Sequence, residues 1–325
     1  MWSRAMRQVR CDGRPRSVET TIGGKWRSSY GHFAAVRRSE REASSLTAPG
    51  ALFVARGRIG YTERVVESLY QPFPMLPGRR AQAWRHQPAY RRPRHFHPEP
   101  ELNVVCRGTA LIGLGERAVR LGPGNLIFFH PGQDHVLLEA SDDLELWVLA
   151  LRPELAGQAL KSLARVASVG SSLSAASITN LESTLSALAQ LSDANAVEIK
   201  TVELFASMQT HLSTNHVLSR RALEEVSARP NTSGARLAQR LAVGPSVLSR
   251  NFHDNFGLTF VSFRARHRAM AFVRLVDSGQ SLTRAATSAG FGSYAQCHRV
   301  ISKVLGCSPN RYFAGERARI DEATT

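Results

Sequence analysis

Residues 95 to 151 are dominated by short apolar runs that alternate with glycine-containing turns. The runs are LNVVC, TALIGLG, AVRL, NLIFF and LELWVLAL. Strands of about five residues separated by turn signals are typical of an antiparallel sandwich or a small barrel. No helical pattern follows Gly113-Leu-Gly115, so this segment is interpreted as a hairpin turn rather than a dinucleotide-binding loop. We predict a small antiparallel β-barrel over residues 81–152.

The pattern becomes helical after Pro153. Five apolar residues fall on one helical face at spacings of 3, 4, 3 and 3, namely Ile178, Leu181, Leu185, Leu188 and Leu191. A second amphipathic helix is predicted from Val197 to Leu212. The leucine stripe is either a dimer seam or a surface that packs on the chain's own barrel, because two heptads are too few to identify a coiled coil. Residues 153–216 are therefore interpreted as a helical linker and a candidate dimerisation region.

The last hundred residues contain one pattern twice. LSRNF at residue 248 matches CHRVI at residue 297, an offset of 49, and Ala238 matches Ala286 at an offset of 48. Each copy has a helix with a small residue, a glycine-containing turn, and a second helix whose apolar residues recur at i, i+4 and i+8. This is the helix-turn-helix pattern, in which the second helix enters the major groove of DNA. We predict two such units, joined by one continuous helix from Phe260 to Val276.

The outward faces of the two second helices are the predicted DNA-reading surfaces. They are formed by Ser246, Ser249, Arg250 and His253 in the first unit and by Tyr294, Ala295, His298 and Arg299 in the second. Arg250 and Arg299 are the leading candidates, because a guanidinium donates two hydrogen bonds to guanine O6 and N7. The alternative role for these arginines is phosphate binding. Two reading helices about 34 Å apart would enter successive major grooves on one face of the duplex.

The net charge of +16 is unevenly distributed along the chain. Residues 1–94 carry a net +13, residues 95–228 a net −6 and residues 229–325 a net +9. Because phosphate contacts supply most of the non-specific affinity for nucleic acid, this segregation predicts that only part of the chain contacts DNA. Residues 1–80 are rich in Arg, Ser, Gly and Pro, show no sustained period, and are predicted to form a basic, largely disordered leader.

Several classes of protein are excluded by composition. No run approaches the ~18 uncharged apolar residues that a membrane helix needs, and the N-terminus lacks the apolar stretch of a secretory signal. The four cysteines, Cys11, Cys106, Cys297 and Cys307, form no Cys-x-x-Cys pair, which argues against a disulfide scaffold and a cysteine zinc site. We expect a cytoplasmic protein without a membrane partner.

A second candidate site lies in the acidic middle of the chain, at His95, His97, Glu101 and His135. Two imidazoles two residues apart on a strand share one face, and a carboxylate and a histidine from a facing strand could complete a metal site. The alternative is that the four side chains line a ligand pocket at the barrel mouth, with Trp147 as a wall. We predict the ligand pocket, with no catalytic residue and no bound cofactor, and keep the four residues as candidate metal ligands.

The C-terminal pattern resembles the AraC/XylS family of bacterial transcription regulators over residues ~220 to 318. The motifs that carry the resemblance are LAQRL, PSVLSRNFHDNFG, ATSAGF and GCSPNRY. The chain departs from the family pattern at Cys297 and Ile301, where aromatic residues are usual, and at Phe313 and His267, where arginine is usual. The resemblance implies a DNA-binding domain over residues 217–320, with two helix-turn-helix units joined by a long helix.

The histidine spacing resembles the two cupin motifs, HxH(x)3E(x)6G and a run from glycine to PxGxxH. His130 stands where proline is usual, and Glu139 stands where asparagine is usual. The resemblance implies a cupin-like ligand-sensing domain over residues 81–152.

These patterns together predict a multidomain α+β protein, with the barrel followed by an all-α double helix-turn-helix domain. The predicted function is a ligand-responsive, dimeric transcription regulator that binds promoter half-sites and a small-molecule effector, and that contacts RNA polymerase where it acts as an activator. A ligand would shift the population between two arrangements of sensor and DNA-binding domain. The alternative is a cupin-type metalloenzyme with an accessory helical domain, which would need an occupied metal and turnover.

Overall fold

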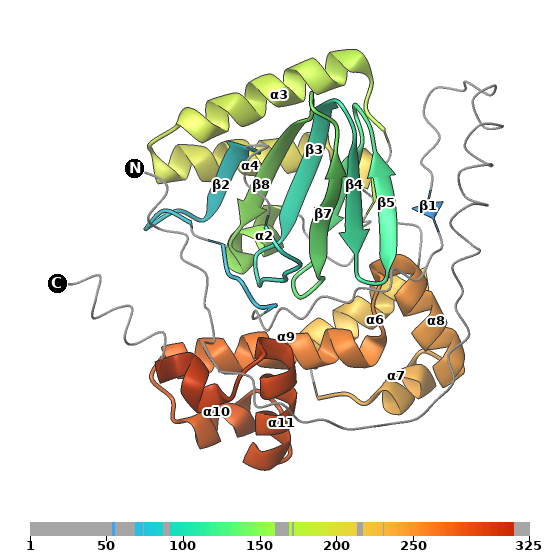
Figure 1. Ribbon diagram of the computed structural model, residues 1–325, viewed down its shortest axis with the longest axis vertical. Coiled ribbons are helices and arrows are strands. Elements are labelled where there is room, and N and C mark those ends of the chain that lie inside the picture. Colours follow the sequence, from blue (N-terminus) through green and yellow to red (C-terminus); the bar gives the residue numbers. More distant parts are fainter. Residues whose placement is uncertain are drawn as a thin grey trace, which may run out of the picture. The chain divides into compact units, whose positions relative to one another are not determined.

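The structure is a computed structural model that describes residues 54–55, 69–73, 75–86, 92–159, 169–170, 172–212, 217–229 and 231–314. Strands come first along the chain and helices follow them (Figure 1). This order confirms the predicted α+β layout, with an antiparallel β domain followed by a helical domain. Most of the predicted leader, residues 1–80, lies outside the described residues.

The described part of the β domain contains two antiparallel four-stranded sheets. Their strands are β1 (Val54–Ala55), β2 (Ala81–Arg85), β3 (Glu101–Arg107), β4 (Ala110–Leu114), β5 (Arg117–Leu121), β6 (Leu126–Phe129), β7 (His135–Ala140) and β8 (Glu145–Leu151). One sheet has the order β1-β5-β4-β7 and the other the order β2-β8-β3-β6. No described strand of one sheet pairs with a strand of the other, so a single closed barrel, as predicted, is not seen.

One face of the second sheet is covered by helices α3 (Ala175–Gln190) and α4 (Ala194–Ser207), as Figure 1 shows. The short helices α2 (Pro153–Ala159) and α5 (Gln209–Leu212) flank them. Leu181, Leu185 and Leu188 of the predicted stripe are buried in one cluster with residues of β2, β3 and β8. The stripe therefore packs on the chain's own sheet, and these three leucines are not free to form a dimer seam.

The C-terminal helices form two similar units. They are α6 (Val217–Ala228), α7 (Gly234–Arg240), α8 (Pro245–Phe256), α9 (Phe260–Asp277), α10 (Leu282–Ser288) and α11 (Tyr294–Leu305). Helix α9 begins in the hydrophobic cluster of the first unit, through Phe260 and Phe263. It ends in the cluster of the second unit, through Phe272 and Val273. The predicted joining helix is thus present.

The turns of the two units have the same backbone conformation with different residues. Ala242 has a φ of 55° in the first turn, and Gly290 has a φ of 88° at the equivalent position of the second. A left-handed conformation costs a residue with a Cβ roughly 1–2 kcal/mol, whereas glycine adopts it freely. Gly244 and Gly292, the pair of glycines that lie 48 residues apart in the two predicted turns, are not the left-handed residues.

Among the described residues, no helix is both long enough and apolar enough to cross a membrane.

Candidate functional site

Helix α8 presents a polar face to solvent and buries its other face. Leu248, Phe252 and Phe256 are buried against α6, α7 and α9, as the i, i+4, i+8 spacing predicts. Of the four predicted reading residues, Ser246, Ser249 and Arg250 are exposed. The fourth, His253, is half-buried, because its Nε2 lies 3.3 Å from the Glu116 carboxylate in the turn between β4 and β5.

Helix α11 has the same arrangement. Cys297, Ile301 and Leu305 are buried. Of the four predicted reading residues, Ala295 and Arg299 are exposed. Tyr294 and His298 are half-buried, and their ring centroids are 6.2 Å apart. Neither Arg250 nor Arg299 forms an ion pair with a residue in the described ranges. Both guanidiniums are therefore available to an external anion or base.

The sequence argument passed over Val247, which lies beside Ser246 on α8. This apolar side chain is 50% exposed. Val247 is not part of the hydrophobic cluster under α8, and its methyl groups can contact the methyl group of thymine. Its position between Ser246 and the inward Leu248 could have identified it from the sequence.

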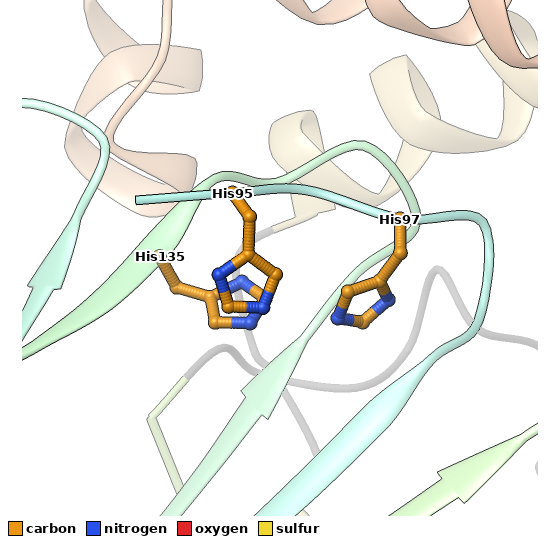
Figure 2. A group of neighbouring side chains, drawn as sticks. All are labelled: His95, His97 and His135. Atoms are coloured by element: carbon orange, nitrogen blue, oxygen red, sulfur yellow. The ribbon is translucent and has the colours of Figure 1, made fainter. Parts of the chain in front are cut away.

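The sensor brings the three predicted histidines together. Each offers one ring nitrogen, and these nitrogens lie within 4.8 Å of one another. Figure 2 shows the His95 and His135 rings side by side, with the His97 ring facing them from the same extended segment as His95. Glu101 at the start of β3 completes the group, with its Oε2 3.0 Å from His97 Nε2 and 3.5 Å from His135 Nε2.

Backbone carbonyls set the orientation of the histidine rings. The Nδ1 atoms of His95, His97 and His135 lie 2.7, 2.7 and 3.1 Å from the carbonyl oxygens of Pro93, Glu99 and Gln133. A carbonyl oxygen only accepts, so Nδ1 donates its proton and Nε2 of the neutral ring keeps a free lone pair. His135 Nε2 is buried and has no hydrogen-bond partner among the described residues. The site is therefore rich in lone pairs.

Burial decides the charges in this cluster. Burial lowers the pKa of His97, and the pKa of His95 is held well below its ordinary value by burial and by nearby His135. Burial would raise the pKa of Glu101, but the His135 and His97 side chains beside its carboxylate hold it well below its usual range. A carboxylate therefore faces the neutral imidazole of His97. Two acceptors 3.0 Å apart repel each other unless a proton or a cation lies between them.

These four residues fit a transition-metal ion. Imidazole nitrogens and a carboxylate oxygen are its usual ligands, and hydrogen bonds that fix the outer ring nitrogen are typical of metal-binding histidines. Two atoms that each lie about 2.1 Å from one ion are about 3.0 to 3.4 Å apart. The separations of Glu101 Oε2 from the two Nε2 atoms, 3.0 and 3.5 Å, are close to this range.

A cavity of about 110 Å³ adjoins the cluster. His95, Glu101 and His135 line it, together with residues that the sequence argument did not select, among them Trp84, Arg92 and Asn103. Asn103 Nδ2 donates to Glu101 Oε1 at 2.6 Å. Because Asn103 lies two residues after Glu101 on β3, the period of a strand could have placed it on the same face. The cavity is smaller than the ~300–1,000 Å³ of pockets for drug-sized ligands.

Trp147 does not form a wall of this cavity. It is buried in the hydrophobic cluster with α3 and α4. Val148, the next residue of β8, lines the cavity instead. Successive side chains of a strand face opposite sides of the sheet, so the prediction placed Trp147 on the wrong face.

Two family models match the chain in succession. Residues 77–207 match an AraC-like ligand binding domain, and residues 237–315 match a helix-turn-helix domain. The first match spans the histidine cluster and helices α3 and α4, and the second spans both reading helices. No curated protein matches the chain.

Similar solved structures are distant. ToxT from Vibrio cholerae O395 is 13% identical, with 72% of this chain and 96% of that chain covered and a TM-score of 0.40. A DNA-binding transcriptional dual regulator from Escherichia coli K-12 is 22% identical over 31% of this chain and 92% of its own, with a TM-score of 0.27. The AraC-like transcriptional activator CuxR is 14% identical over 65% and 78%, with a TM-score of 0.26.

The two family matches occur in the order that the fold shows, with the sensor sheets before the paired helix-turn-helix units. The chain is therefore an AraC-family, ligand-responsive transcription regulator with an N-terminal ligand-binding domain and a C-terminal helix-turn-helix DNA-binding domain.

Proposed function

We propose that this regulator reads promoter half-sites through the outward faces of α8 and α11, with Arg250 and Arg299 as the base-reading residues. The observation that carries the proposal is their equivalent placement, exposed and 49 residues apart, on two copies of one scaffold. Ser246, Ser249 and His253 of α8 and Tyr294, Ala295 and His298 of α11 would complete the two surfaces. A net charge of +9 over residues 229–325 supports contact with a polyanion.

The experiment is selection of double-stranded DNA from a random library with the full chain, followed by affinity measurements on the selected site. Arg250→Ala and Arg299→Ala should each cost about 1–3 kcal/mol on the selected site and relax the preference at one base pair. Arg236 and Arg284 are the matched controls, because they are exposed and lie at equivalent positions of α7 and α10. Their alanine variants should weaken binding to all sequences alike. Equal losses on selected and random DNA would remove the base-reading role from Arg250 and Arg299.

We further propose that the effector binds at His95, His97, Glu101 and His135, beside the cavity of about 110 Å³. The small volume favours a small effector, and the buried Glu101 carboxylate with its neutral imidazoles favours a cation or a donor-rich molecule. Binding would stabilise one arrangement of the sensor relative to the DNA-binding domain.

A transition-metal ion is the second candidate occupant, either as the effector itself or as part of an enzymatic centre. The Nε2 lone pairs of His97 and His135 beside Glu101, with His95 in the same cluster, favour it. Elemental analysis of untagged protein distinguishes a metal site from a metal-free pocket. About one metal per chain, lost in His97→Ala and kept in the control His211→Ala, supports the metal. Background metal in all three proteins, together with changed DNA binding in His97→Ala, supports the metal-free pocket.

The proposal extends to a homodimer in the cytoplasm that contacts RNA polymerase when it activates transcription. The stripe of α3 is already packed, so the dimer surface lies elsewhere. Ile199 on α4, which is 61% exposed, supports a surface on this helix. Sedimentation of the purified chain tests it, and a monomer at micromolar concentration that stays monomeric on DNA would contradict it.

A further inference from the structure

The segment His95-Phe96-His97 has two functional faces. Successive side chains of an extended segment point to opposite sides, and here the two histidines point into the sensor cluster. Phe96 between them is completely buried, but in a different place. It belongs to the hydrophobic cluster of the second helix-turn-helix unit, with Phe272 and Phe291. The centroid of its ring is 5.6 Å from that of Tyr70, and the Cζ atom of Arg266 lies over the ring, 5.0 Å from its centroid.

Hydrogen bonds hold this segment from both sides. His95 N and O pair with O and N of His135 at 3.1 and 2.9 Å. Phe96 N donates to Leu69 O at 2.7 Å, and Gly132 N donates to His97 O at 3.0 Å. These hydrogen bonds join the three residues to both the sensor and the segment that ends at Tyr70, so the two imidazoles and the Phe96 ring are carried by one short, extended unit.

The loop that carries His135 is attached to the same helix, α9. Asp134 is buried between Arg94 and Arg266, with its carboxylate oxygens 3.0 and 2.6 Å from their Nη1 atoms. His267 Nε2 donates to Pro131 O at 3.0 Å. A Cβ added at Gly132 would lie 3.2 Å from Met270 Cε, so the loop packs directly against α9. Both walls of the histidine cluster thus contact the helix that joins the two reading units.

We propose that Phe96 is the positioning residue that couples occupancy of the histidine cluster to the DNA-binding helices. The inference rests on the proposed effector site. Occupancy pulls the His95 and His97 side chains toward the bound group. Phe96, on the opposite face of the same three residues, then shifts in the cluster formed by α9, α10 and α11. Because α9 also carries the core of the first unit, the shift changes the position of one reading helix relative to the other.

The test is a double-mutant cycle on the full chain that needs no identified effector. His97→Ala perturbs the cluster, and Phe96→Leu shortens the proposed connection while the site remains apolar. Two readouts are measured: affinity for the selected DNA, and amide exchange along α9 without DNA. In the native background, His97→Ala should change both by about fivefold or more, a typical allosteric coupling. In the Phe96→Leu background, it should change them by less than about twofold, the scatter of independent sites.

Phe205→Leu is the matched control, because Phe205 is an equally buried phenylalanine of the same domain, in the cluster under α3 and α4. In this background, the effect of His97→Ala should persist. If Phe96→Leu does not fold, Phe96→Met serves in its place, because the unbranched methionine side chain adapts to an irregular apolar site. Two results would overturn the coupling. One is that His97→Ala has the same effect in the Phe96 variant as in the native chain. The other is that His97→Ala changes neither readout in the native chain. Failure to select any DNA sequence would instead overturn the proposed function, while α9 exchange still reports on the coupling.

Discussion

The first helix-turn-helix unit, α7 with α8, and the second, α10 with α11, place equivalent residues 48 or 49 positions apart. Both reading helices end at a left-handed glycine, Gly257 with a φ of 70° and Gly306 with a φ of 75°. The units differ at several structural positions. The first inward residue is Leu248 in one and Cys297 in the other, and the left-handed turn residue is Ala242 in one and Gly290 in the other. One scaffold therefore tolerates different side chains where the backbone geometry is kept.

Their surroundings differ as well. The first reading helix contacts the sensor directly, since Gln133 Nε2 donates to Phe256 O at 2.9 Å and Glu116 N donates to Gly257 O at 2.9 Å. The second unit receives Phe96 into its hydrophobic cluster. The contact of the first unit is also buried: Gln133 is 1% exposed, and the ring centroids of His130 and Phe256 are 5.2 Å apart. The sensor therefore contacts the end of the reading helix in the first unit, but the hydrophobic cluster behind the reading helix in the second.

The largest difference should appear at the inward residue. Leu248→Ala removes a buried leucine and should cost about 2–5 kcal/mol of stability, whereas Cys297→Ala removes only a sulfur and should cost about 1 kcal/mol. Thermal and urea unfolding, followed by helical circular dichroism, measures both. Equal losses would show that the two cores are packed alike despite the smaller residue.

Exchanging the turn residues should have opposite effects in the two units. Gly290→Ala forces a Cβ into a left-handed conformation and against the Asn231 side chain, and should destabilise by about 1–2 kcal/mol. Ala242→Gly relieves the same strain and should stabilise by about 0.5–1 kcal/mol, because the added freedom of the unfolded chain offsets part of the gain. Unfolding midpoints of the two variants check this. A stabilising Gly290→Ala would mean that the second turn has a different conformation.

The smallest effect concerns base reading at equivalent positions of the two reading helices. Val247 of α8 is exposed and apolar, whereas its counterpart Gln296 accepts a hydrogen bond from Gly292 N through its own side chain. If Val247 contacts a thymine methyl, replacing that thymine by deoxyuridine should cost the native chain about 0.8 kcal/mol or less. Val247→Ala should show no further loss on the uracil site. If replacing thymine by deoxyuridine weakens DNA binding by Val247→Ala as much as it weakens binding by the native chain, the methyl contact belongs to another residue.

The sequence alone was sufficient for features that depend on local periodicity. The i, i+4, i+8 spacing placed Leu248, Phe252 and Phe256 inward, and the duplication revealed the second unit. The spacing of His95, His97, Glu101 and His135 likewise brought together four side chains that the structure places in one cluster. Such patterns are readable because the periods of helices and strands are constant, whatever packs against them.

The tertiary structure decided what covers each face. Periodicity placed the α3 leucines on one face, but only the fold showed that this face lies on the chain's own sheet. Strand alternation separates Trp147 from Val148, but it does not say which of them faces the cavity. The same holds for Phe96, whose burial in the DNA-binding domain depends on a helix about 170 residues further along the chain. The physical reason is that burial of an apolar face stabilises the fold with any well-packed partner, so a sequence pattern specifies the face and only three-dimensional packing specifies the partner.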